Sequence, residues 1–194
     1  MRVLIVYESG YGQAEKVARA LAGAIRGEGH DAEVARASSR PSLTGVDAVI
    51  AGGSVRIGNH QRELVRFCRE RRDELVRLPS AFYSVSVSAR RRFGAGQREV
   101  AKALSRFIAQ TGWTPRELWP IAGALNYTRY TLPIKAMLVL ISLMSGGDTD
   151  ASRDHEYTDW AAVESLGIRF ARAHAPVSRS HGAQTASAGR VAFN

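Results

Sequence analysis

Three short apolar runs, each followed by a loop of small and polar residues, constrain the fold of this chain most strongly. The runs are Arg2–Tyr7, Asp47–Ala51 and Ala81–Val87, and valine, alanine and aromatic residues dominate them. Continuous apolar runs of this length are typical of strands that are buried on both faces. After each loop, apolar residues recur at the three- and four-residue spacing of an amphipathic helix. This alternation predicts a parallel sheet with helices on both of its faces.

Two weaker segments complete the predicted sheet, Asp31–Ala35 and Leu118–Leu125. Pro120 lies in the second of them, and because proline lacks an N–H group this strand belongs at a sheet edge or a bulge. The predicted fold class is α/β, a three-layer αβα sandwich with five parallel strands in the order 2-1-3-4-5. In that order the ligand crevice lies at the carboxyl ends of the first and third strands, where the topology changes direction.

The chain has 194 residues, enough for one domain with a sizeable core, and we assign this domain to residues 1–175. Residues 176–194 lack periodicity and are predicted to form a disordered tail. Residues 126–156 interrupt the alternation as a long insert, and inserted loops of this length tend to be functional. Within the insert, the apolar run Ile134–Met144 is long enough for three helical turns but too short to span a bilayer.

The composition narrows the classes of partner. The net charge of +9 suits nucleic acid, anionic lipid or an acidic small molecule. No nucleic-acid-binding motif accompanies the charge, so no nucleic acid partner is predicted, and the five histidines lack the spacing of metal ligands. Cys68 is the single cysteine, which excludes an internal disulfide. Without a signal-peptide pattern or a membrane-length apolar run, we expect a cytoplasmic protein.

The loop after the first strand offers the elements of an anion site. A helix that begins near Gly12 directs its free N–H groups at this loop, and its dipole favours an anion there. Gly10 and Gly12 allow a close approach to the backbone, and Ser9 adds a hydroxyl group. The loop matches neither the Walker A nor the GxGxxG pattern. Its spacing alone leaves two interpretations open, a phosphate cradle and an ordinary capped turn.

The stretch "YESGYGQA" resembles the phosphate loop of flavodoxins. By that resemblance, the residues that bind the phosphate of FMN are Ser9, Gly10, Tyr11, Gly12, Gln13 and Ala14. The flavodoxin pattern has threonine at the position of Ala14, so one hydroxyl group is missing here. Because a hydrogen bond to a charged group contributes about 1.5–3 kcal/mol, we expect this chain to bind FMN more weakly than usual.

Four further stretches resemble the menaquinone-dependent protoporphyrinogen oxidases of bacteria, which are flavodoxin-like. They are "LPSAFYSVSVSAR", "IAGALNYTRY", "LMSGGDTD" and "YTDWAAV". The resemblance extends over about residues 1–174 and includes the long insert. It implies FMN-dependent oxidation of protoporphyrinogen IX in haem synthesis, with menaquinone or another quinone as the electron acceptor. A flavodoxin-like electron carrier is the alternative, but the basic charge and the scarcity of shielding aromatic residues favour the enzyme.

The predicted topology and the resemblance together assign the remaining cofactor-binding residues. They lie in the loops after the third and fourth strands and in the insert: Ser54, Val55, Arg56, Ile57, Gly58, Ser84, Val85, Ser86, Val87, Ser88, Gly147, Asp148 and Thr149. Because the flavin carries the redox chemistry, no catalytic side chain is predicted.

Substrate and membrane contacts are expected at five places. Arg56 and Arg90 could bind the propionates of the substrate through bidentate pairing, or form an ordinary solvated charged surface. Tyr127 and Tyr130 could replace the aromatic residues that cover the flavin in flavodoxins, or serve in packing. A helix over Ile134–Met144 could dock on anionic lipid as a peripheral anchor. The alternative for this helix is packing on the core or in a homo-oligomer interface.

Overall fold

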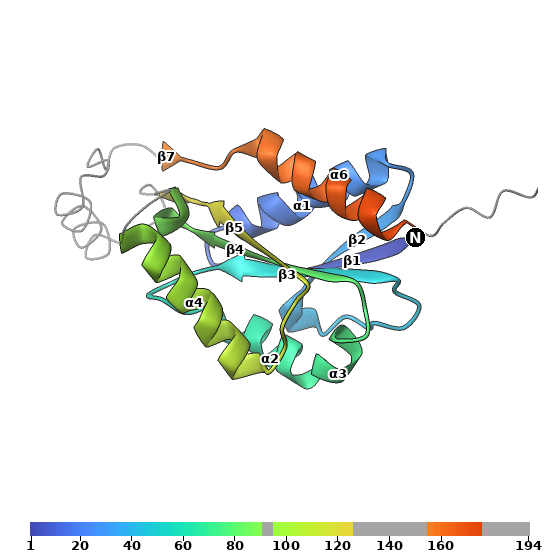
Figure 1. Ribbon diagram of the computed structural model, residues 1–194, viewed down its shortest axis with the longest axis horizontal. Helices are drawn as coiled ribbons and strands as arrows, with labels where there is room; N and C mark the ends of the chain where they lie inside the picture. Colours follow the sequence, from blue (N-terminus) through green and yellow to red (C-terminus); the bar gives the residue numbers. More distant parts are fainter. Residues whose placement is uncertain (91–94, 126–154, 176–194) are drawn as a thin grey trace, which may run out of the picture.

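A five-stranded parallel sheet forms the centre of the computed structural model, which describes residues 1–90, 95–125 and 155–175 (Figure 1). Its strands are β1 (Arg2–Glu8), β2 (Asp31–Arg36), β3 (Ala48–Ser54), β4 (Ser80–Ser86) and β5 (Glu117–Ala122). Their spatial order is β2-β1-β3-β4-β5, and every neighbouring pair is parallel. The predicted strand order is therefore confirmed.

Helices cover both faces of the sheet, as the alternation of strands and helices predicts (Figure 1). One face carries α1 (Gln13–Gly27) and α6 (Trp160–His174), and the other carries α2 (Arg62–Glu70), α3 (Arg72–Leu75) and α4 (Ala95–Thr111). The 3-10 helices η1 (Ala37–Ser39) and η2 (Val87–Arg90) follow β2 and β4. The three-layer αβα sandwich is confirmed.

Alternate residues of the central strands supply the two halves of the hydrophobic core. On β1, Val3 and Ile5 pack with apolar residues of α1 and α6, whereas Leu4 and Val6 pack with apolar residues of α2 and α4. All four are buried, because successive side chains of a strand point to opposite faces of the sheet. This burial on both faces explains why the strand reads as a continuous apolar run.

The chain leaves the sheet earlier than the sequence predicted. β5 ends at Ala122, whereas one continuous strand was predicted over Leu118–Leu125. Gly123 follows, and its N–H donates to the carbonyl of Ser86 at 3.0 Å. β6 (Ala124–Leu125) then pairs with β7 (His155–Glu156) in a separate antiparallel ladder. β5 is an edge strand, as Pro120 indicated. A proline is tolerated in an edge strand because one side of that strand has no neighbour to which an N–H group would donate.

The last helix, α6, begins after a side-chain cap. Asp159 is the N-cap, and its Oδ1 accepts a hydrogen bond from the N–H of Ala162 at 3.0 Å. Thr158 has a different role, since its hydroxyl donates to the carbonyl of Ala122 at 2.7 Å. It therefore anchors the segment before α6 to the end of β5.

The predictions for the insert and for the tail fall beyond the part of the chain that the structure describes. These predictions are the apolar helix over Ile134–Met144 and the disordered tail over residues 176–194. Among the helices of the described ranges, none combines the length and the apolar character needed to cross a membrane.

Candidate functional site

The carboxyl ends of β1, β3 and β4 meet at one edge of the sheet. Glu8 pairs with Gly53, and Ser54 pairs with Val85. One residue further, the N–H of Val55 donates to the carbonyl of Val85 at 2.8 Å. The loops that follow these three strands therefore begin side by side, as the predicted crevice requires.

The first of these loops ends in a helix start that no side chain caps. Gly12 is the N-cap of α1, with φ 91° and ψ −15°. Its N–H donates to the Oγ atom of the buried Ser9 at 2.9 Å, so the hydroxyl proton of Ser9 can point to another acceptor. An uncapped helix start presents N–H donors and the positive end of the helix dipole. This loop can therefore hold an anion.

Glu15, the acidic residue in the first turn of α1, is paired with two arginines. Glu15 accepts hydrogen bonds from Arg19 at 2.8 Å and from Arg36 at 3.3 Å. The hydrogen bond from Arg19 is the main cause that holds the pKa of Glu15 below its usual value. Its negative charge is therefore compensated by two guanidinium groups and opposes a bound anion less than a bare carboxylate would.

Gln13 uses its side chain to tie this loop to the segment before α6. Its Nε2 atom donates to Glu156 at 2.7 Å and to the hydroxyl of Thr158 at 2.8 Å. Lys16 adds an ion pair with Glu156 at 3.6 Å. The amide side chain of Gln13 is therefore engaged elsewhere, and its contribution to a bound anion would come from the backbone N–H.

A tyrosine braces the start of α1 against the sheet. Tyr83 of β4 is fully buried, and its hydroxyl donates to the carbonyl of Ala14 at 2.9 Å. Burial raises the pKa of Tyr83 well above its usual value, so the phenol remains a donor. Its ring lies over Gly52 of β3, where a Cβ atom would come within 2.2 Å of the ring carbons. The absence of a side chain at Gly52 therefore leaves the space that the ring occupies.

Ala14 belongs to the core as well as to the loop. Its side chain is fully buried and packs in the part of the core beneath α1 and α6. The weaker FMN binding expected from its missing hydroxyl group stays a prediction, which an FMN titration tests.

The second loop forms a tight turn with an apolar tip. Arg56 and Asn59 exchange backbone hydrogen bonds of 2.8 and 3.1 Å. The two residues between them, Ile57 and Gly58, have φ angles of 49° and 70°, the pattern of a type I′ turn. A β-branched residue is strained in this region, yet Ile57 occupies it with its side chain 83% exposed. The turn thus presents an apolar group to solvent beside the candidate site.

Two arginines connect this turn to neighbouring segments. Arg106 of α4 donates to the carbonyl of Gly58 at 3.1 Å and to the side chain of Asn59 at 3.2 Å. The guanidinium of Arg56 lies 5.9 Å from the ring centroid of Tyr11, within the range of a cation–π contact. Arg56 and Tyr11 thereby link the first loop to the second.

The third loop begins with η2, which follows β4 directly. Ser86 caps it through a hydrogen bond from the N–H of Ala89 at 3.2 Å, while Val87 and Ser88 are half-buried. Arg90 is the last residue of η2. The predicted site residues of the insert lie outside the described ranges: Tyr127, Tyr130, Gly147, Asp148 and Thr149.

Ser84 is buried inside the sheet layer, and its hydrogen-bond partner there is the side chain of His60. His60 is only 6% exposed, and its Nε2 atom lies 3.0 Å from the Oγ atom of Ser84. Its ring contacts the rings of Phe82 and Phe107 edge-on, at centroid distances of 5.1 and 5.2 Å. This burial depends on two aromatic residues that are distant in sequence, so local sequence does not reveal it.

The pH dependence of stability should report the burial of His60. Burial lowers its pKa to about 4 from 6.5. Between these values the unfolded chain binds a proton that the folded chain does not, so the free energy of unfolding should fall by about 3 kcal/mol as the pH drops from 6.5 to 4. Urea unfolding across this range should show a smaller decrease for His60→Phe. Equal decreases in both proteins would contradict the assignment.

The sheet and the loops of the candidate site were compared with models of known protein families. A family model described as "Flavodoxin domain" matches residues 4–152 of this chain. The chain belongs to the flavodoxin family. Among curated relatives of this flavodoxin-domain chain is "Protoporphyrinogen IX dehydrogenase (quinone)" of Escherichia coli (strain K12). The two are 33% identical over 173 residues, which cover 88% of this chain and 95% of the relative.

A further relative and two solved structures are also similar to this chain. A relative of the same name from Leishmania major is 32% identical over 129 residues, which cover 66% of this chain and 55% of that protein. Among solved structures, oxidised Flavodoxin 1 of Bacillus cereus superposes with a TM-score of 0.55 at 15% identity, covering 89% of this chain and 98% of that one. Flavodoxin 2 of Bacillus cereus superposes with a TM-score of 0.52, also at 15% identity, covering 89% and 99%. At such identities the structures show the fold alone.

A flavodoxin domain implies a flavin cofactor, and the described residues fit one. The uncapped start of α1 and the hydroxyl of Ser9 offer hydrogen-bond donors for an anionic group. The loops after β3 and β4 begin beside this point, where a flavin ring could lie between them. The chemistry of the donors and their place in the topology therefore agree with a flavin at the carboxyl edge of the sheet.

Proposed function

We propose that this chain oxidises protoporphyrinogen IX to protoporphyrin IX, with FMN as its cofactor and a quinone as its electron acceptor. The observation that carries the proposal is the 33% identity to the Escherichia coli dehydrogenase over 95% of that protein's length. Identity at this level and coverage favours the enzyme over a flavodoxin-like electron carrier. The solved flavodoxins are only 15% identical to this chain, so their likeness is one of fold alone.

The residues that would hold FMN are those of the first loop. The hydroxyl of Ser9 and the first backbone N–H groups of α1 would bind its phosphate, and Tyr83 holds this helix start against the sheet. When bound, FMN supplies the two-electron redox chemistry. The second and third loops, Ser54–Gly58 and Val85–Ser88, would flank the ring.

The second loop would also bind the substrate, a flat apolar macrocycle with two propionates. Ile57 offers an exposed apolar side chain, and the exposed Arg56 next to it offers a guanidinium for a carboxylate. We assign no proton-transfer step to His60, because it is buried against two aromatic rings and bonded to Ser84. Arg90, at the end of η2, is the second candidate for a propionate.

Replacing Arg56 with alanine should raise the KM for protoporphyrinogen IX about tenfold and leave kcat nearly unchanged. The reason is that one charge-assisted hydrogen bond to a propionate is lost, which is worth about 1.5–3 kcal/mol. Steady-state kinetics of Arg56→Ala and Arg90→Ala test this. Arg77→Ala, at an exposed position remote from the loops, is the control. An unchanged KM in both variants would rule out the propionate role.

Anaerobic turnover of protoporphyrinogen IX with a soluble quinone tests the proposed function. Porphyrin fluorescence should appear only when protein, FMN and quinone are all present. A protein that binds FMN and accepts electrons from a chemical reductant, but yields no porphyrin, would support the electron carrier instead. A protein without flavin absorbance after added FMN would contradict both.

We further propose that the chain works at the inner face of the cell membrane, since its quinone partner is lipid-soluble. Ile134–Met144 would provide the contact as an apolar helix, in a protein whose net charge of +9 favours anionic lipid. Flotation with anionic liposomes compares the full chain with a variant that lacks this segment. Equal partitioning of the two would assign the segment to internal packing or to an oligomer interface.

A further inference from the structure

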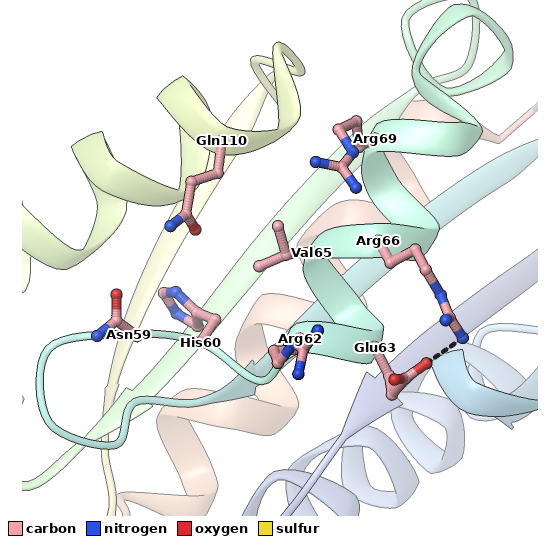
Figure 2. Close-up of a pocket in the computed structure, with 8 residues that line it drawn as sticks. All are labelled: Asn59, His60, Arg62, Glu63, Val65, Arg66, Arg69 and Gln110. Carbon is pink, nitrogen blue, oxygen red and sulfur yellow. Dashed lines mark hydrogen bonds and ion pairs between the residues drawn. The ribbon is translucent and has the colours of Figure 1, made fainter.

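A pocket of about 460 Å³ opens between α2 and α4 (Figure 2). These helices cover the face of the sheet opposite α1 and α6 (Figure 1). The polar lining of the pocket comes from α2, from Gln110 of α4 and from Asn59, which follows the tight turn. The residues of α2 are Arg62, Glu63, Arg66 and Arg69. The proposed flavodoxin-type redox chemistry assigns no role to the three arginines.

The charges of this pocket are not balanced. Arg66 forms an ion pair with Glu63, drawn as a dashed line in Figure 2. Arg62 and Arg69 are exposed, and the side chain of neither forms a hydrogen bond or an ion pair with any residue of the described ranges. Two uncompensated guanidinium groups therefore border one concave site, and this leaves it with a positive potential.

The two unpaired arginines lie at opposite ends of the pocket. They are seven positions apart in sequence, so they lie on one side of α2, two turns or about 10 Å apart along the helix axis. Figure 2 shows Arg69 toward one end of the pocket, with Gln110 across from it on α4, and Arg62 toward the other end, with His60 between Arg62 and Asn59. Gln110 and Asn59 add side-chain amides to the lining, and amide N–H groups can donate further hydrogen bonds. A ligand that uses both ends needs more than one anionic group, or one extended group.

We propose that this pocket binds a small molecule that carries phosphate groups, with a diphosphate as its simplest form. A phosphoryl group has a charge of about −1.5 to −2 near neutral pH, which matches the two uncompensated charges of Arg62 and Arg69. Guanidinium groups bind phosphate oxygens in pairs, and amides complete the coordination. The volume lies within the range of small-molecule sites, about 300–1,000 Å³.

Calorimetric titration of inorganic pyrophosphate tests the proposal, with the full chain loaded with one equivalent of FMN. The wild-type protein should bind pyrophosphate, and added salt should weaken the binding. Arg62→Gln/Arg69→Gln should bind it about tenfold more weakly or worse, because hydrogen bonds to a charged group are lost. Arg77→Gln/Arg98→Gln removes two exposed charges outside the pocket and should bind like the wild type. Arg69→Lys should show an intermediate loss.

Circular dichroism and thermal melting establish that each variant is folded, as expected for substitutions at exposed positions. Equal affinity of Arg62→Gln/Arg69→Gln and the wild type would overturn the proposal, as would a lack of binding by the folded wild type. Equal losses in both double variants would also overturn it, since they indicate a diffuse effect of net charge. Vesicles of phosphatidylglycerol form a second arm of the experiment. Binding to these vesicles without binding to pyrophosphate would assign the charges to a lipid surface and contradict a small-molecule site.

Discussion

Replacing Gly52 with alanine should lower the free energy of unfolding by about 3 kcal/mol, the largest stability effect we expect from adding one methyl group. The new Cβ atom would lie 2.2 Å from two ring carbons of Tyr83. That ring is fully buried, so it cannot move aside without disturbing its neighbours. Its displacement would also break the hydrogen bond from Tyr83 to the carbonyl of Ala14 and loosen the start of α1.

Urea unfolding measures this effect, and Gly23→Ala supplies the matched control. Gly23 lies inside α1, where a Cβ atom would meet nothing within 4 Å. There the same substitution should stabilise the protein by about 0.5–1 kcal/mol, because alanine favours the helix. The two variants should therefore shift the unfolding midpoint in opposite directions. A Gly52→Ala protein as stable as the wild type would show that Tyr83 has another accessible position.

Replacing Gly12 with alanine should reduce FMN affinity about a hundredfold, the largest functional effect we expect. Gly12 has φ 91°, where a side chain is strained by about 1–2 kcal/mol. Relief of that strain would rotate the backbone at the start of α1 and turn N–H donors away from the phosphate. Two lost hydrogen bonds to a charged group account for an effect of this order, at about 1.5 kcal/mol each.

Fluorescence titrations with FMN and with riboflavin separate the possible causes. Riboflavin lacks the phosphate, so Gly12→Ala should change its binding little. Gly10→Ala is the control in the same loop, because a Cβ atom at Gly10 meets nothing within 4 Å and its φ is not positive. It should bind FMN within about threefold of the wild type, which corresponds to less than 1 kcal/mol. Equal losses for FMN and riboflavin in Gly12→Ala would indicate unfolding of the loop rather than a lost phosphate contact.

The sheet was predictable from sequence because its central strands are buried on both faces. Val3 to Val6 read as an unbroken apolar run for that reason, and the runs around Ile50 and Phe82 read in the same way. Parallel strands joined by helices allow few connections, which is why the strand order could be predicted as well. The end of β5 was missed, because the chain leaves the sheet at Gly123 through a bond to Ser86 that has no local sequence signal.

The sequence predicted the individual loops of the candidate site but not the contacts between them. The glycines and the helix start indicated where an anion could be held, but not that Gln13 bonds to Glu156 and Thr158, more than 140 positions away in sequence. The strained tip at Ile57 was equally hidden, since a β-branched residue argues against positive φ. Such features arise from contacts between distant segments, and local propensity carries no information about them.

The small antiparallel ladder of β6 and β7 has a consequence for the construction of the chain. Leu125 is paired with His155, so the chain returns to the point from which it left the sheet. Thr158 then fastens the returning strand to Ala122, the last residue of β5. We therefore expect that a two-residue Asn-Gly turn in place of residues 126–154 would join Leu125 to His155 and leave the sheet connected as before. The sheet is thus joined through one junction to the segment that contains Gly147, Asp148 and Thr149, so removing that segment should affect cofactor binding and leave the sheet intact.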